Sequence, residues 1–76
     1  KYINIFKECV ISVKSALNLA VVKTIKGMGV SVCSFIDKLN LTELMGATYG
    51  DDTVLLVFPS TTFASEAVVT LNQLML

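Results

Sequence analysis

The run from Thr53 to Phe58 constrains the fold of this chain more than any other segment. Its sequence, TVLLVF, consists of residues that favour β-strands, and the turn-forming residues Gly50-Asp51-Asp52 precede it. Successive side chains of a strand point to opposite faces of the sheet, and both sets are apolar here: Val54, Leu56 and Phe58 on one face, Leu55 and Val57 on the other. A strand that is apolar on both faces is covered on both faces.

The size of the chain limits what can cover this strand. With 76 residues, of which 54% are hydrophobic and 16% charged, the chain forms one small domain that buries only about 60% of its unfolded surface. In a two-layer domain of this size, helices cover only one face of the sheet. We therefore expect the other face to meet another subunit, because large exposed apolar patches usually mark interaction sites.

Three further segments have the composition of strands. Residues 9–14 and 19–25 are rich in β-branched side chains, and the four residues between them, 15–18, are few enough for a hairpin. Residues 44–49 are the third candidate and lead into the Gly50-Asp51-Asp52 turn. Together with residues 53–58 they predict a sheet of four antiparallel strands.

Two segments have the apolar spacing of helices. Residues 30–39 follow a break at Lys26-Gly27-Met28-Gly29 and end before Asn40, which can act as a stop. After Pro59, a cap is available for a last helix from Ser60, Thr61 or Thr62. The apolar stripe of that helix consists of Ala64, Ala67, Val68, Leu71, Leu74 and Met75.

These elements predict a single α+β domain over residues 1–76. Its order is β-β-α-β-β-α, in two layers, with both helices on one face of the four-stranded antiparallel sheet. The chain begins at Lys1 rather than at a methionine, as expected of a piece of a longer protein.

The composition argues against several functions. Histidine and arginine do not occur, and the serines have no nearby general base, so we do not expect an enzyme. Six lysines balance six acids, and a net charge of zero provides no basic surface for nucleic acid. Charged residues interrupt the apolar stretches before they reach the roughly 18 residues of a membrane-spanning helix, so we expect no membrane partner.

The two cysteines, Cys9 and Cys33, do not make a zinc site without histidine ligands. We interpret them as reduced, buried thiols of a cytoplasmic protein. One disulfide in a secreted protein is the alternative.

The turn Gly50-Asp51-Asp52-Thr53 is the local feature that suggests binding. Adjacent carboxylates repel one another unless a cation or hydrogen-bond donors satisfy them. An ordinary solvated hairpin turn explains these residues on spacing alone. Two kinds of cation site compete with that interpretation: a divalent metal, which would need further oxygen ligands from several chains, and a guanidinium or ammonium group, which carboxylates bind by charge-assisted hydrogen bonds.

The same region resembles the C-terminal domain of bacterial arginine repressors. The resemblance rests on Phe35-Ile36-Asp37 and on Leu44-Met45-Gly46-Ala47-Thr48-Tyr49-Gly50-Asp51-Asp52-Thr53, which is similar to a family pattern reading roughly L-G-T-I/V-x-G-D-D-T. The hydrophobic strand and the last amphipathic helix also match, and the resemblance covers about Phe6 to Leu76. It implies a homo-oligomer in which two trimers stack into a hexamer.

The resemblance also implies an effector, L-arginine, bound at the interface between trimers and stabilising the hexamer by linkage, with no cofactor or metal. Asp51 and Asp52 would hold the cationic groups of arginine, Asp37 would contribute, and the backbone of Tyr49 would line the pocket. Family members bind DNA through an N-terminal winged-helix domain, which lies outside this chain. The implied function is oligomerisation and arginine sensing in a cytoplasmic transcription regulator of arginine metabolism, including amino-acid biosynthesis.

One loop departs from the family. The family commonly reads P-G-N-A-Q or P-G-A-A-Q there, and its glutamine contacts the ligand. This chain reads Lys26-Gly27-Met28-Gly29-Val30, so Val30 occupies the ligand-binding position and cannot hydrogen-bond a ligand. Lys26 is a candidate for a built-in cation at the aspartates. These departures support a second hypothesis, an oligomerisation scaffold of the same fold with weakened or lost arginine binding.

Overall fold

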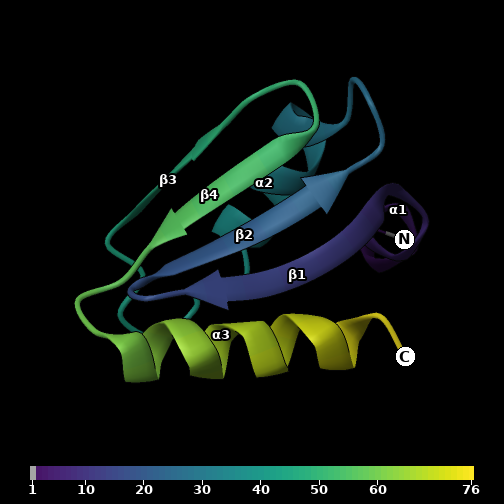
Figure 1. Ribbon diagram of the computed structural model, residues 1–76. Coiled ribbons are helices and arrows are strands. Elements are labelled where there is room, and N and C mark those ends of the chain that lie inside the picture. The colour runs from purple at the N-terminus through teal and green to yellow at the C-terminus, as the bar shows by residue number, and fades with distance from the viewer. Residues whose placement is uncertain (1) are drawn as a thin grey trace.

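The computed structural model describes residues 2–76 and has, over these residues, three helices and one four-stranded antiparallel sheet (Figure 1). The strands lie in the order β1-β2-β4-β3. The elements are α1 (Tyr2–Cys9), β1 (Val10–Ala16), β2 (Leu19–Thr24), α2 (Gly29–Asp37), β3 (Gly46–Tyr49), β4 (Thr53–Val57) and α3 (Thr61–Leu74). The predicted α+β class and the four antiparallel strands are confirmed, and one helix, α1, is added at the start.

The first hairpin turns at Leu17 and Asn18 alone. Leu17 adopts a φ of 55°, and Asn18 is tied to the far end of β4 in two ways. Its side-chain Nδ2 donates to the carbonyl oxygen of Phe58, and its own carbonyl oxygen accepts from the Phe58 amide, both at 3.0 Å. These bonds let β1 continue to Ala16, two residues beyond the predicted end of the strand.

Helices α2 and α3 lie on the same face of the sheet, as predicted. Helix α3 packs on β1 and β2, while α2 packs mainly on β3 and β4 (Figure 1). Between the helices and the sheet, Val54, Leu56 and Phe58 are fully buried. The alternate residues Leu55 and Val57 are only partly buried and lie on the other face, so the two apolar faces predicted for this strand are confirmed.

Helix α1 was not predicted because its residues carry no capping signal and its first turn has no acidic residue. Tertiary packing explains why it forms. Phe6 is fully buried in the core, and its ring lies 5.1 Å from the ring of Phe35 on α2, measured between centroids, with an interplanar angle of 36°. The gain from burying this aromatic pair stabilises a helix that is too short to be stable alone.

Helix α3 follows the prediction closely. Ser60 is its N-cap, and the Ser60 hydroxyl accepts a hydrogen bond from the Phe63 amide at 3.4 Å. Ala64, Ala67 and Leu71 of the predicted stripe are buried. The remaining stripe residues pack partly buried against the core: Val68, Leu74 and Met75.

Helix α2 begins one residue earlier and ends two residues earlier than predicted. Asn40, the predicted stop, adopts a left-handed φ of 52° just beyond it. Cys33 on α2 and Cys9 are both buried free thiols, as the preferred interpretation had it. Burial, followed by the nearby charge of Asp37, raises the pKa of the Cys33 thiol.

The face of the sheet away from the helices is apolar at its centre. We call it the outer sheet face, and it consists of Ala16, Leu19, Val21, Leu55 and Val57, which the strand register places side by side. The accessible surface of the domain, 4514 Å², is what a compact chain of this mass exposes. The apolar residues on this face are therefore not a result of loose packing. Within residues 2–76, every helix is too short or too polar to cross a membrane.

Candidate functional site

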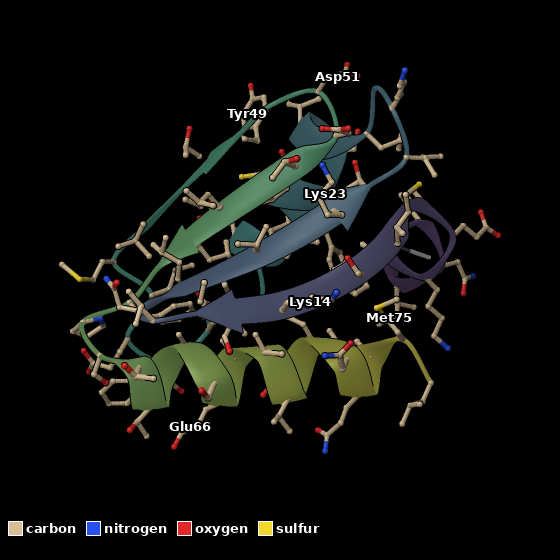
Figure 2. All side chains as sticks on the ribbon, viewed as in Figure 1. Lys14, Lys23, Tyr49, Asp51, Glu66 and Met75 are labelled. Carbon is tan, nitrogen blue, oxygen red and sulfur yellow. The ribbon has the colours of Figure 1, made fainter. Side chains whose placement is uncertain are left out.

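The aspartate pair lies in the tight turn between β3 and β4. The amide of Gly50 donates to the carbonyl oxygen of Thr53 at 2.7 Å, which closes the turn. This places Asp51 and Asp52 at the end of the hairpin, where Asp51 is exposed and Asp52 is about half-buried. Figure 2 shows Asp51 at the tip of the turn, beyond the end of the sheet. We call residues 50–53 the aspartate turn.

The backbone of the aspartate turn is fixed by the segment that leads into α2. The carbonyl oxygen of Asp51 accepts from the amides of Gly27 and Gly29, at 3.1 and 3.0 Å. The carbonyl oxygen of Asp52 accepts from the amide of Thr24 at 2.8 Å. Three bonds from outside the hairpin thus hold the turn, so its two carboxylates project from a rigid backbone rather than from a solvated loop.

Two glycines make this close approach possible. Gly27 adopts a φ of 84°, a left-handed conformation that side chains disfavour. Gly29 is buried, and a Cβ added there would collide with the carbonyl oxygen of Gly50. The family patterns quoted above have alanine at the position of Gly29. This chain therefore allows the start of α2 to pack more closely against the aspartate turn than an alanine would.

The side chain of Asp52 is held by two neighbours. The Thr53 hydroxyl donates to Asp52 Oδ1 at 3.0 Å, and Lys23 Nζ lies 3.4 Å from the same oxygen. Lys23 Nζ also donates to Thr53 Oγ1 at 2.8 Å. These contacts favour the ionised carboxylate, so the hydrogen bond from Thr53, and then Lys23, lowers the pKa of Asp52 below its usual value.

The built-in cation is thus Lys23, and the prediction that Lys26 would take this role is wrong. Lys26 is exposed, and among residues 2–76 it forms no ion pair. Lys23 is the last lysine of β2, directly opposite Thr53 of β4 in the sheet. Its role depends on the pairing of β2 with β4, which are separated in sequence by a helix and a strand. Neither Lys23 nor Thr53 was predicted to hold Asp52.

Tyr49 and Val30 are neighbours in sequence of the residues that form the aspartate turn and its contact with α2: Tyr49 precedes Gly50, and Val30 follows Gly29. Tyr49 ends β3, pairs with Val54 and has a side chain that is 54% exposed. Val30 follows Gly29 directly, and is 47% exposed. Its side chain lines a groove of about 270 Å³ with residues of α1, of α2 and of the position just after α2: Ile5, Ser31, Ser34, Phe35 and Lys38.

Asp37 is separated from the aspartate turn within one chain. It is the last residue of α2, whereas the turn packs against the first, Gly29, about 12 Å away along the helix axis. Over residues 2–76, no three acidic, cysteine or histidine side chains lie close enough together to hold a metal ion. A divalent metal takes six or more oxygen ligands, whereas two carboxylates can hold a guanidinium, so the aspartate turn suits an organic cation better.

Comparison with known proteins identifies the family of the domain. A family model described as the C-terminal domain of the arginine repressor matches residues 6–73. The arginine repressor of Acetivibrio thermocellus is 39% identical over 74 residues, which are 97% of this chain and 48% of that protein. The arginine repressor of Clostridium novyi is 33% identical over 75 residues, 99% of this chain and 50% of that protein. That of Clostridium tetani is 38% identical over 68 residues, 90% of this chain and 44% of that protein.

The chain spans about half the length of the curated relatives it matches. Those relatives are named as repressors and not as enzymes, in agreement with the prediction that this chain is not an enzyme. Since the family match extends over the sheet, the aspartate turn and both predicted helices, this chain belongs to the family of arginine repressor C-terminal domains.

Proposed function

We propose that this chain is the oligomerisation and L-arginine-binding domain of a cytoplasmic transcription regulator of arginine metabolism. The observation that carries the proposal is the aspartate turn, in which Asp51 and Asp52 project from a backbone held by three external hydrogen bonds. A rigid carboxylate pair binds a cation with little loss of conformational freedom, because the binding geometry exists before the ligand arrives. The guanidinium and α-ammonium groups of arginine provide the complementary charges.

The outer sheet face supports the proposal of a homo-oligomer. Leu55 and Val57 of β4, together with their neighbours on β2, present apolar side chains that water would otherwise contact. A second copy of the chain buries them at the trimer interface, and two trimers then stack. Arginine bound at the aspartate turn, between trimers, stabilises the hexamer because it binds the hexamer and not the separate trimers. The stabilisation grows with the affinity of arginine for the hexamer.

The remaining predicted ligand residues take positions around this interface. We expect the backbone of Tyr49, which directly precedes Gly50, to line the pocket. Asp37, at the opposite end of α2, meets another part of the ligand or a ligand held by a different subunit. The net charge of zero gives this domain no excess of positive charge for DNA, so we expect another part of the full-length regulator to bind it.

A second candidate function, an oligomerisation scaffold with weak or no arginine binding, is favoured by Val30. In this chain the position of the family glutamine carries an apolar side chain that lines a groove with Phe35 and Ile5. One hydrogen bond to the ligand is thereby lost. The two functions share the assembly and differ only in ligand affinity.

Isothermal titration calorimetry separates the two functions. We expect the wild type to bind L-arginine more tightly than L-citrulline, which has the same length but a neutral side-chain end. Asp52→Asn is expected to weaken arginine binding at least about tenfold, because a charge-assisted hydrogen bond is lost. Glu66→Gln, a matched loss of an exposed acid on α3, is expected to have no effect. No arginine heat at millimolar ligand would leave the scaffold as the function.

A further inference from the structure

The two carboxylates of the aspartate turn are not equivalent. Lys23 and Thr53 face each other across β2 and β4, and both reach Asp52 Oδ1. Asp51, by contrast, is exposed, and within residues 2–76 its carboxylate is in no ion pair. Figure 2 shows Lys23 rising from the end of β2 while Asp51 lies beyond it at the tip of the turn. The structure therefore already holds one ammonium group at half of the cation site.

This ammonium must be shared or displaced when a ligand reaches Asp52. The Lys23 and Asp52 side chains are 45% and 42% exposed, so their pair is accessible to a competing cation and is not locked in the core. Exchange of one cation for another gains only the difference between their interactions with the carboxylate. The gain is therefore set by how much better the ligand binds Asp52 than Lys23 does.

The difference depends on the chemistry of the ligand. A primary ammonium group, as in L-lysine or L-ornithine, offers the same point charge and the same donors as Lys23 and gains little by replacing it. A guanidinium presents a planar fork of donors that forms paired hydrogen bonds with carboxylates and can bridge Asp51 and Asp52. Displacing Lys23 costs the same free energy for every ligand, so displacement alone creates no preference. Lys23 and Thr53 both contact Oδ1 of Asp52, however, so a guanidinium fork can bind Asp51 and Oδ2 of Asp52 while Lys23 stays in place. A single ammonium group has to displace Lys23 to gain comparable contacts, and the internal lysine thus penalises ammonium ligands more than guanidinium ligands.

We propose that Lys23 is a specificity-determining residue of the aspartate turn, an internal competitor that lets a guanidinium ligand bind and disfavours an ammonium ligand. This inference rests on the proposed arginine-binding function and adds a residue and a selection rule to it. Thr53 is the positioning residue of the competitor, because its hydroxyl accepts from Lys23 Nζ at 2.8 Å and donates to Asp52.

The test is calorimetric titration of the wild type and of lysine variants with L-arginine and with L-lysine. For Lys23→Met we expect both ligands to bind more tightly, L-arginine by about two- to fivefold, the range for removal of an exposed ion-pair competitor. The gain for L-lysine is expected to be larger, so that the preference for arginine falls. Lys23→Arg, which places a guanidinium fork at Asp52, is expected to bind L-arginine more weakly than the wild type does.

Lys14→Met is the matched control. Lys14 lies on β1 and points to the same side of the sheet as Lys23, but it pairs with Val21 in the register and is in no ion pair among the described residues. It removes the same charge without freeing Asp52. Equal effects of Lys14→Met and Lys23→Met would overturn the proposal, because they would show a general effect of net charge. Weaker or unchanged binding by Lys23→Met would also overturn it.

The outcomes separate this proposal from the proposed function. If the wild type binds L-arginine and Lys23→Met leaves both affinities unchanged, arginine binding stands and the role of Lys23 fails. If Lys23→Met binds L-arginine and the wild type does not, the role of Lys23 stands and the wild type is the scaffold. If no variant binds either ligand, both proposals fail. Circular dichroism of each variant verifies that the fold is retained.

Discussion

At the scale of single residues, Asp52 determines how the aspartate turn responds to pH. Its contacts with Thr53 and Lys23 exist only with the ionised carboxylate, and they lower its pKa in the folded state. A group whose folded-state pKa is depressed contributes stability above its unfolded-state pKa, and that stability is lost as the pH falls through the folded-state pKa. We therefore expect arginine binding, like these contacts, to be lost in that acidic range.

The pKa of Asp52 can be measured by carbon-13 NMR titration of its carboxyl group. The hydrogen bond from Thr53 is the largest cause of the depressed pKa, and Lys23 is the next. Thr53→Val and Lys23→Met are therefore each expected to raise the pKa of Asp52 toward its usual value, because Thr53 contributes a hydrogen bond and Lys23 both a hydrogen bond and a positive charge. No change in either variant would contradict the contacts described here.

The residue pattern allowed part of this site to be predicted. Asp51 and Asp52 stood out because adjacent acids in a turn need a cation or donors. The identity of the internal cation did not follow from the pattern, because it depends on which strand lies beside β4. Lys26 belongs to the loop that was compared with the family, but the antiparallel register places Lys23 opposite Thr53. The pairing of two strands that are distant in sequence cannot be inferred from local residue patterns.

At the scale of elements, the site is built by packing the start of α2 against the β3–β4 turn. Gly29 is buried and its amide donates to Asp51, so the helix can approach only because this residue has no side chain. The turn and the helix are therefore one unit in which a change in either displaces the carboxylates. We therefore expect a change in the first turn of the helix to affect a hairpin that lies about 20 residues further along the chain.

Gly29→Ala tests that unit. Its Cβ would meet the Gly50 carbonyl, a backbone atom that cannot rotate away, so we expect a loss of about 1–3 kcal/mol in the free energy of unfolding and weaker arginine binding. Gly46→Ala is the control, because a Cβ on β3 at Gly46 has no atom within 4 Å. Urea denaturation measures both variants. Equal stability of the two would show that the close contact is absent in solution.

The elements also show what local patterns can and cannot predict. Strand β4 and helix α3 were located almost to the residue, since Pro59 and Ser60 separate a β-branched run from a clear apolar stripe. Helix α1 was missed because it depends on the contact between Phe6 and Phe35, which are far apart in sequence. The ends of β1 and α2 shifted by one or two residues because backbone bonds to Phe58 and Asp51 fix them.

At the scale of the whole molecule, the apolar residues of the strands are divided between the two faces of the sheet. One face of the sheet is buried beneath α2 and α3, and the outer sheet face has no layer over it within residues 2–76. The helices of the described residues pack on the opposite face. We therefore expect a second copy of the chain to cover this face, with the aspartate turn placed where the assembled subunits meet.

The most direct test of the proposed oligomer is its molecular mass in solution, measured by light scattering at micromolar concentration with and without L-arginine. We expect the wild type to form a trimer or hexamer of the 8.2 kDa chain and the hexamer to increase with arginine. Leu55→Lys, which places a charge on the outer sheet face, is expected to give a folded monomer, whereas Val69→Lys, on the exposed side of α3, keeps the oligomer. A wild type that remains a monomer with and without arginine would contradict the account.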